Sequence, residues 1–118
     1  MKAKKHIEFD RVFAYLTEGK TDILWFENED VMRRVGECLV ELIKNNSLVI
    51  FDRPGLLLTR GYDAGGVCVK ITHNTHEQEI RFASEKQMQR AGQCLIDLAR
   101  IGGNEDEIKD KENGGKEL

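Results

Sequence analysis

The chain has 118 residues, enough for one domain with its own hydrophobic core. Its formal net charge is −3, and six acids against three bases in residues 102–118 account for that excess. The balanced remainder excludes the strongly basic footprint of a general duplex-DNA binder and leaves room only for a local basic groove.

The first half is predicted to form a hairpin and a helix. Residues 7–16 and 21–26 are strand-like, and residues 17–20 form the turn between them. Asn28 is a good helix N-cap, because two acids follow it in the first turn, where negative charge suits the helix dipole. The apolar spacing predicts a helix to about residue 44.

The second half is predicted to form four strands and a helix. Apolar runs at 48–51 and 56–60 are joined by a Pro-Gly turn, and a glycine-rich loop follows at 61–66. Residues 67–72 and 77–83 form a hairpin with 73–76 at its tip, in a register that places Val69 opposite Ile80 and Lys70 opposite Glu79. Ser84 begins a capping box, and the helix ends at a Gly-Gly pair at 102–103.

One phrase of the sequence occurs twice, 56 residues apart. The first occurrence contains Met32, Arg34, Gly36, Cys38, Leu39 and Leu42, and the second contains Met88, Arg90, Gly92, Cys94, Leu95 and Leu98. The phrase lies in both predicted helices and indicates an internal pseudo-repeat. A glycine inside a helix costs about 1 kcal/mol relative to alanine. Its presence at one point of both helices is explained by close approach of the helices to each other or to the sheet, or by a ligand that contacts the glycine backbone.

These elements predict an α+β fold in the order ββα-ββββα. We expect an antiparallel sheet of about six strands with two helices on one face. Residues 1–103 form a single domain, and residues 104–118, charged and poor in apolar side chains, form an acidic disordered tail.

The cysteines and the hydropathy indicate the compartment. The chain has three cysteines, an odd number without a CxxC motif, which is typical of reduced thiols rather than of a disulfide framework or a zinc site. No stretch approaches the roughly 20 apolar residues of a membrane span, and the basic N-terminus is not followed by the apolar core of a signal peptide. We therefore expect a cytoplasmic protein without a membrane partner.

The first hairpin is expected to carry an apolar outer face. Phe13, Tyr15, Leu24 and Phe26 are assigned to its inward side. The outward side would then consist of Val12, Ala14, Leu16, Ile23 and Trp25. An apolar patch of this kind marks an interface or a groove. Its cover is a second copy in a homodimer or another partner, a segment of the same chain, or a small ligand.

Signals for chemistry are few. Arg53, Arg60 and Arg81 lie on or beside the predicted sheet and, with Tyr62, are the candidates for binding an anionic ligand. His73 and His76 flank a hairpin tip but lack a third metal ligand. GxSxG, HExxH and P-loop motifs are missing. We assign no catalytic residue, no metal site and no cofactor, and the protein is not expected to be an enzyme.

The order of four strands and a helix over residues 47–100 resembles the repeat of the PUR and Whirly families, which bind single-stranded nucleic acids. The resemblance implies a similar fold and a similar ligand. The basic-aromatic strand signature of PUR repeats is not present in residues 56–71, so no binding residue is assigned from it.

Three hypotheses about function follow. The first is a non-enzymatic binding or inhibitor protein that acts as a homo-oligomer on a protein or a small anionic, nucleotide-like ligand. Its small size and balanced charge also suit an accessory or counter-defence protein of a phage or mobile element. The second is a single-stranded nucleic-acid binder that stacks bases on sheet aromatics. The third is an enzyme whose site has no recognisable motif.

Overall fold

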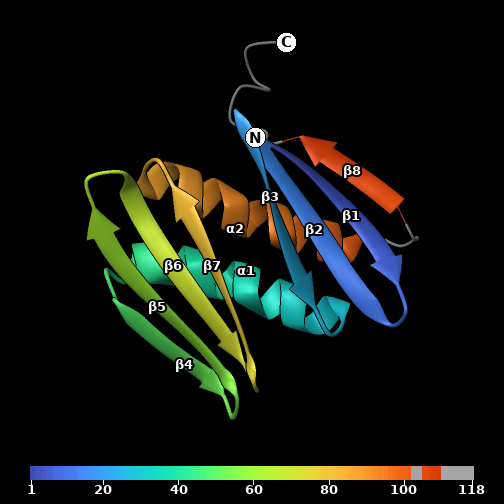
Figure 1. Cartoon of the computed structure of the whole chain (residues 1–118), viewed down its shortest axis with the longest axis horizontal. Coiled ribbons are helices and arrows are strands. Elements are labelled where there is room, and N and C mark those ends of the chain that lie inside the picture. The colour runs from blue at the N-terminus through green and yellow to red at the C-terminus, as the bar shows by residue number, and fades with distance from the viewer. Residues whose placement is uncertain (102–104, 110–118) are drawn as a thin grey trace.

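The computed structural model describes residues 1–101 and 105–109, which form two antiparallel sheets and two helices (Figure 1). The elements in chain order are β1 (Lys2–Glu8), β2 (Arg11–Glu18), β3 (Lys20–Phe26), α1 (Glu29–Lys44), β4 (Val49–Arg53), β5 (Leu56–Asp63), β6 (Gly66–His73), β7 (His76–Phe82), α2 (Glu85–Arg100) and β8 (Glu105–Lys109). Sheet 1 has the strand order β3-β2-β1-β8, and sheet 2 has the order β4-β5-β6-β7.

The described chain is two copies of one unit, in which three strands, a helix and a fourth strand follow one another. The helices begin at residues 29 and 85, the third strands at 20 and 76, and the fourth strands at 49 and 105. Each pair is separated by the 56 residues that separate the two phrases of the sequence. The fourth strand of each unit joins the sheet of the other unit, because β4 pairs with β5 and β8 pairs with β1. The two units are therefore interlocked.

The α+β class is confirmed, but the single sheet of about six strands is wrong. β1 was not predicted, because its charged residues hide the strand pattern. The predicted single strand at 7–16 is also wrong, because the chain makes a tight turn inside that range. In that turn Phe9 and Asp10 have φ angles of 51° and 63°. Residues 105–109, predicted to belong to a disordered tail, pair instead with β1 as β8. The rest of that predicted tail lies outside the described residues.

Both helices begin at the predicted caps. The side chain of Asn28 accepts a hydrogen bond of 2.9 Å from the backbone N–H of Val31, and that of Ser84 accepts one of 3.1 Å from Gln87. These bonds satisfy donors that the first turn of a helix leaves without an intrahelical acceptor. No helix in the described parts of the chain is long and apolar enough to cross a bilayer.

The helices cross at their two glycines. A Cβ atom built on Gly36 would lie 2.6 Å from the carbonyl oxygen of Gly92, and one built on Gly92 would lie 2.7 Å from that of Gly36. No side chain fits at these distances, which confirms the predicted close approach between helices. The symmetric contact also explains why the glycine recurs at one point of the repeated phrase.

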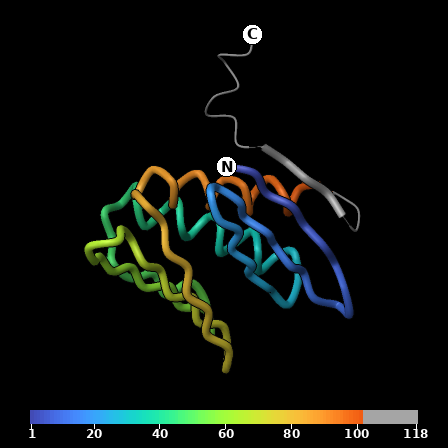
Figure 2. The backbone as a smooth tube through the Cα atoms, turned by 45° about the horizontal axis from the view of Figure 1, so that its top comes forward, coloured from blue at the N-terminus to red at the C-terminus, as the bar shows by residue number. Residues whose placement is uncertain are grey.

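Both sheets pack one face on the helix pair and leave the other face uncovered by any helix. In Figure 1 the two sheets lie side by side in front of α1 and α2, and the turned view of Figure 2 shows the same separation of strands from helices. Apolar residues from both sheets and both helices form one continuous core between these layers.

Each sheet also places one cation in the interior. The Nζ atom of Lys5 lies 2.9 Å from a carboxylate oxygen of Glu29 at the start of α1 and 3.1 Å from the carbonyl oxygen of Leu98 near the end of α2. At the equivalent place in sheet 2, Arg60 lies 2.9 Å from Glu85 at the start of α2. Both cations are buried, so they need these partners. One ion pair thus holds sheet 1 to the start of α1, and the other holds sheet 2 to the start of α2.

Candidate functional site

Three residues predicted for the outer patch belong to the core instead. Val12, Ala14 and Leu16 are only 3%, 0% and 2% exposed and face the helices. On β3 the predicted faces are confirmed, with Leu24 and Phe26 in the core, but on β2 they are reversed, because the β2–β3 turn has a single residue, Gly19, at its tip with a φ of 80°. A turn with one central residue places even-numbered positions of both strands on one side of the sheet. The core thus receives the aliphatic residues of β2, and the aromatic residues of β2, Phe13 and Tyr15, face outward.

The uncovered side of sheet 1 is therefore a different surface from the one predicted. We call it face 1. Strand alternation and the observed register give it these members: Lys2, Lys4, His6, Glu8, Arg11, Phe13, Tyr15, Ile23 and Trp25. Of the residues predicted for an interface, Ile23 and Trp25 lie here, with Ile23 57% exposed.

The aromatic residues of face 1 lie in neighbouring positions of the sheet. Phe13 on β2 is directly opposite Trp25 on β3, and Tyr15 is directly opposite Ile23. On the other side of β2, His6 is opposite Phe13 and Lys4 is opposite Tyr15. Side chains opposite each other in antiparallel strands are about 5 Å apart at Cβ, so these rings form one continuous platform.

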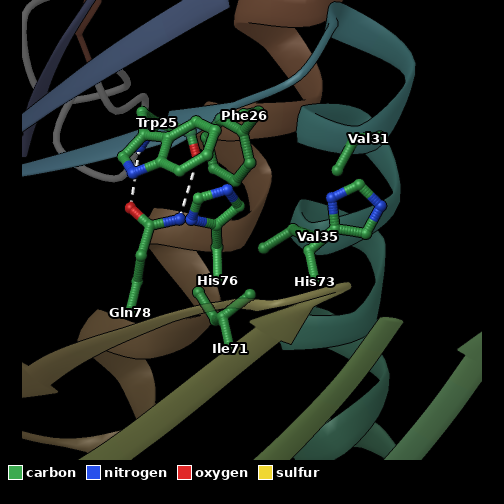
Figure 3. A pocket seen from close by; sticks show the side chains of 8 residues that line it. All are labelled: Trp25, Phe26, Val31, Val35, Ile71, His73, His76 and Gln78. Carbon is green, nitrogen blue, oxygen red and sulfur yellow. Dashed lines mark hydrogen bonds between the residues drawn. The ribbon is translucent and has the colours of Figure 1, made fainter. Parts of the chain in front are cut away.

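The backbone of Trp25 is fixed by a side chain from the other sheet. The amide of Gln78 on β7 accepts a 2.8 Å bond from the Trp25 N–H and donates a 2.7 Å bond to its carbonyl oxygen (Figure 3). The amide thus pairs with the edge of β3 as a neighbouring strand would. This contact closes the seam between the sheets and fixes the backbone from which the indole projects.

The indole of Trp25 contacts the ring of His76 and the guanidinium group of Arg11. The His76 ring stands edge-on to the indole, with centroids 4.6 Å apart and an angle of 77° between the planes. The guanidinium carbon of Arg11 lies 4.7 Å from the indole centroid, within the range of a cation–π contact. Arg11 makes no ion pair among the described residues, and its guanidinium charge therefore lies over the indole without a carboxylate beside it.

Face 1 differs in chemistry from the equivalent surface of sheet 2, although the two interiors follow one plan. The uncovered side of sheet 2, face 2, has these members: Val49, Phe51, Leu57, Thr59, Gly61, Asp63, Cys68, Lys70, Thr72, Glu77, Glu79 and Arg81. On β1, β2 and β3, face 1 carries the rings of Phe, Tyr and Trp residues, three Lys or Arg residues and one acid, whereas face 2 carries the single ring of Phe51, two bases and three acids. This contrast within one chain marks face 1 as the specialised surface.

The predicted anion-binding residues are each engaged by a carboxylate. Arg60 is buried against Glu85, and the hydroxyl of Tyr62 donates a hydrogen bond to that same carboxylate. The hydrogen bond to the Glu85 carboxylate stabilises the protonated phenol and so raises the pKa of Tyr62. Arg60 and Tyr62 therefore come together, with the guanidinium carbon 5.3 Å from the ring centroid, but Glu85 already neutralises the charge of Arg60.

The other two predicted arginines lie elsewhere. Arg81 on face 2 pairs with Asp63 and holds the pKa of that carboxyl group below its usual value. Arg53 lies at the end of β4, opposite Leu56 at the start of β5, where it contacts Asp30 at 3.2 Å and Asp52 at 3.3 Å. The structure thus does not gather the four predicted residues at one place.

The predicted histidine tip packs against the loop that precedes α1. The Nδ1 atom of His73 lies 3.7 Å from a carboxylate oxygen of Glu27, and His73 and His76 line a small apolar pocket with Trp25 and Phe26 (Figure 3). Among the described residues, no group of three or more His, Cys, Asp or Glu side chains is placed to hold a metal ion.

The basic residues of face 1 were not predicted from the sequence. Lys2, Lys4 and His6 alternate with Ala3 and the half-buried Ile7, which is a strand signal, but the intervening Lys5 makes the segment look like a basic arm. Recognition of β1 as a strand would have placed these side chains beside the aromatic residues of β2. In the comparisons with known proteins, no family model, no curated protein and no solved structure matches the chain.

Proposed function

We propose that the protein binds single-stranded nucleic acid on face 1. The supporting observation is the platform of Phe13, Tyr15 and Trp25, with Arg11 stacked on the indole and lysines on the adjacent strand. Bases stack on aromatic side chains whatever their sequence, and cations beside the rings neutralise the phosphates. A duplex hides the faces of its bases, so this platform suits single strands.

The layout of the second half adds support. β4, β5, β6 and β7 followed by α2 have the order that resembles PUR and Whirly repeats. The net charge of −3 is compatible with this ligand because the acidic excess lies in residues 102–118, whereas Lys2, Lys4 and Arg11 lie beside the rings of face 1. The geometry gives less support to an anionic small-molecule ligand at the predicted arginines, since carboxylates already engage them.

The test is the binding of fluorescently labelled DNA and RNA oligonucleotides, measured by anisotropy at several salt concentrations. Phe13→Ala is expected to weaken binding by about 1–3 kcal/mol, which is the cost of losing one stacked base. Arg11→Gln is expected to weaken it and to reduce the slope of log K against log salt concentration by about one.

The matched control is Lys70→Gln on face 2, which is expected to leave the affinity and the salt slope unchanged. Thermal unfolding of each variant separates a binding effect from a folding effect. If the wild-type protein does not bind oligonucleotides at about 50 mM salt, where the electrostatic contribution is strong, the proposal is wrong. If Lys70→Gln weakens binding as much as Arg11→Gln does, face 1 is not the site.

A further inference from the structure

Phe9 has a backbone conformation that a phenylalanine rarely adopts. It is the first of the two residues in the turn between β1 and β2, with a φ of 51°, and Asp10 follows with a φ of 63°. A positive φ at both central residues is what a type I′ turn requires, and Asn or Gly is favoured there. In the described parts of the chain, the other residues with a positive φ are all of the types that tolerate it: Asp10, Gly19, Asn46, Gly55, Gly66 and Asn74. Among the described residues, Phe9 is thus the exception, a bulky side chain in a strained position.

The core does not explain why a phenylalanine stands in this turn. The side chain of Phe9 is 88% exposed, more than that of any other large hydrophobic residue in the described ranges. In Figure 1 the turn lies at the far end of a hairpin that extends past the start of α1. Backbone strain that packing does not compensate is typical of a functional site. The strain at Phe9 thus keeps an aromatic ring in solvent, where a ligand reaches it.

The turn continues the aromatic platform of face 1 along the hairpin. Arg11 follows the turn on β2, and Phe13 and Tyr15 come next on the same side of that strand. Alternate residues of a strand are about 7 Å apart. The rings and the guanidinium group therefore form one line that begins at the turn. Because β1 has seven residues, the hairpin is about 20 Å long.

The charges along this line suit a phosphate backbone. Arg11 lies between the turn and Phe13 and makes no ion pair among the described residues. Towards the other end of the hairpin, Lys4 is opposite Tyr15 and Lys2 is opposite Thr17. The one acid of face 1, Glu8, lies 3.3 Å from the Nε2 atom of His6. An apolar protein partner would be held by the rings alone, whereas a single strand needs rings and cations together.

We propose that Phe9 is a further base-stacking residue and that the bound single strand follows the β1–β2 hairpin from Lys2 to this turn. The inference rests on the proposed function, because it extends the same face. Bases stacked on each other are about 3.4 Å apart, whereas rings two residues apart on β2 are separated by about twice that distance. The strand therefore binds in an extended form, with its bases stacked on the rings instead of on each other. Phe9 takes the base at the end of the track.

The experiment compares Phe9→Asn with the wild-type protein in binding a labelled oligothymidine of about ten nucleotides, which spans the hairpin even when stacked. The variant is expected to bind about 5- to 150-fold more weakly, the effect of losing one stacked base. It is also expected to unfold at a higher urea concentration, because Asn is favoured in this turn. A ring that served only the fold would instead lower both stability and affinity when removed. Phe9→Tyr keeps an aromatic ring and is expected to retain the wild-type affinity.

The matched control is Phe51→Asn, which removes a ring that is 68% exposed on face 2 and is expected to leave the affinity unchanged. The proposal is overturned if Phe9→Asn binds as tightly as the wild type, or if it loses stability together with affinity. It is also overturned if Phe51→Asn weakens binding as much as Phe9→Asn does. When Phe13→Ala weakens binding and Phe9→Asn does not, this inference alone fails. A wild-type protein that does not bind the oligonucleotide overturns the proposed function as well.

Discussion

Glu18, at the end of β2, joins three distant parts of the chain. Its carboxylate accepts hydrogen bonds from Gln87 and from Arg90 of α2, and it lies 3.0 Å from the amino group of Met1. The hydrogen bond from Gln87, followed by the contacts with the amino group and Arg90, lowers the pKa of Glu18 from 4.5 to about 2.

This lowered pKa predicts a pH-dependent contribution to stability. A carboxyl group whose pKa is lower in the folded state stabilises the fold above its unfolded pKa, near 4.5, and loses this contribution as the pH falls to about 2. The free energy of unfolding of the wild-type protein should exceed that of Glu18→Gln at pH 7, and the difference should shrink between pH 4.5 and pH 2. Urea unfolding of both proteins measures it. A difference that is constant over this range would contradict the assignment.

At the scale of elements, the helix crossing decides how closely the two units dock. In a free helix, alanine is favoured over glycine by about 1 kcal/mol. At Gly36 the added methyl group would lie 2.6 Å from the backbone oxygen of Gly92 and 2.9 Å from the Cβ atom of Leu95. Backbone cannot move aside as a flexible side chain can, so the clash outweighs the propensity.

Gly36→Ala should therefore lower the free energy of unfolding by about 1–3 kcal/mol, the usual cost of overpacking a core. Gly61→Ala is the matched control, because a methyl group there meets nothing within 4 Å, and its stability should be unchanged or raised. Chemical unfolding of both variants measures the difference. Equal stabilities for Gly36→Ala and the wild type would show that the helices are not in contact at this point.

The elements that the sequence predicted well have local signals that agree with one another. Both helix caps and the register of the β6–β7 hairpin are confirmed, because Val69 faces Ile80 while Lys70 faces Glu79 on the other side of the same strands. The first hairpin lacks such agreement, since apolar residues occupy both of its sides, and the one-residue turn at Gly19 decided the faces.

At the scale of the whole molecule, the exchange of strands between units could not be predicted from local pattern. Lys5 shows why. A lysine at an inward strand position is unfavourable by local rules, and it is stable here because its ammonium group meets the distant Glu29 and the carbonyl oxygens of Leu98 and Ile101. Face 1 is assembled within one unit instead, because β1 pairs with β2 across the tight turn at Phe9 and Asp10, which the sequence pattern did not reveal.

The most direct test of face 1 uses its own indole. Trp25 is the single tryptophan of the chain, so the intrinsic fluorescence on selective excitation reports this surface alone. Titration with single-stranded oligonucleotides should quench and shift this emission, and the effect should weaken steeply as salt is added. Two results would contradict the account. One is an oligonucleotide that binds without changing the Trp25 emission, and the other is the absence of any binding at about 50 mM salt.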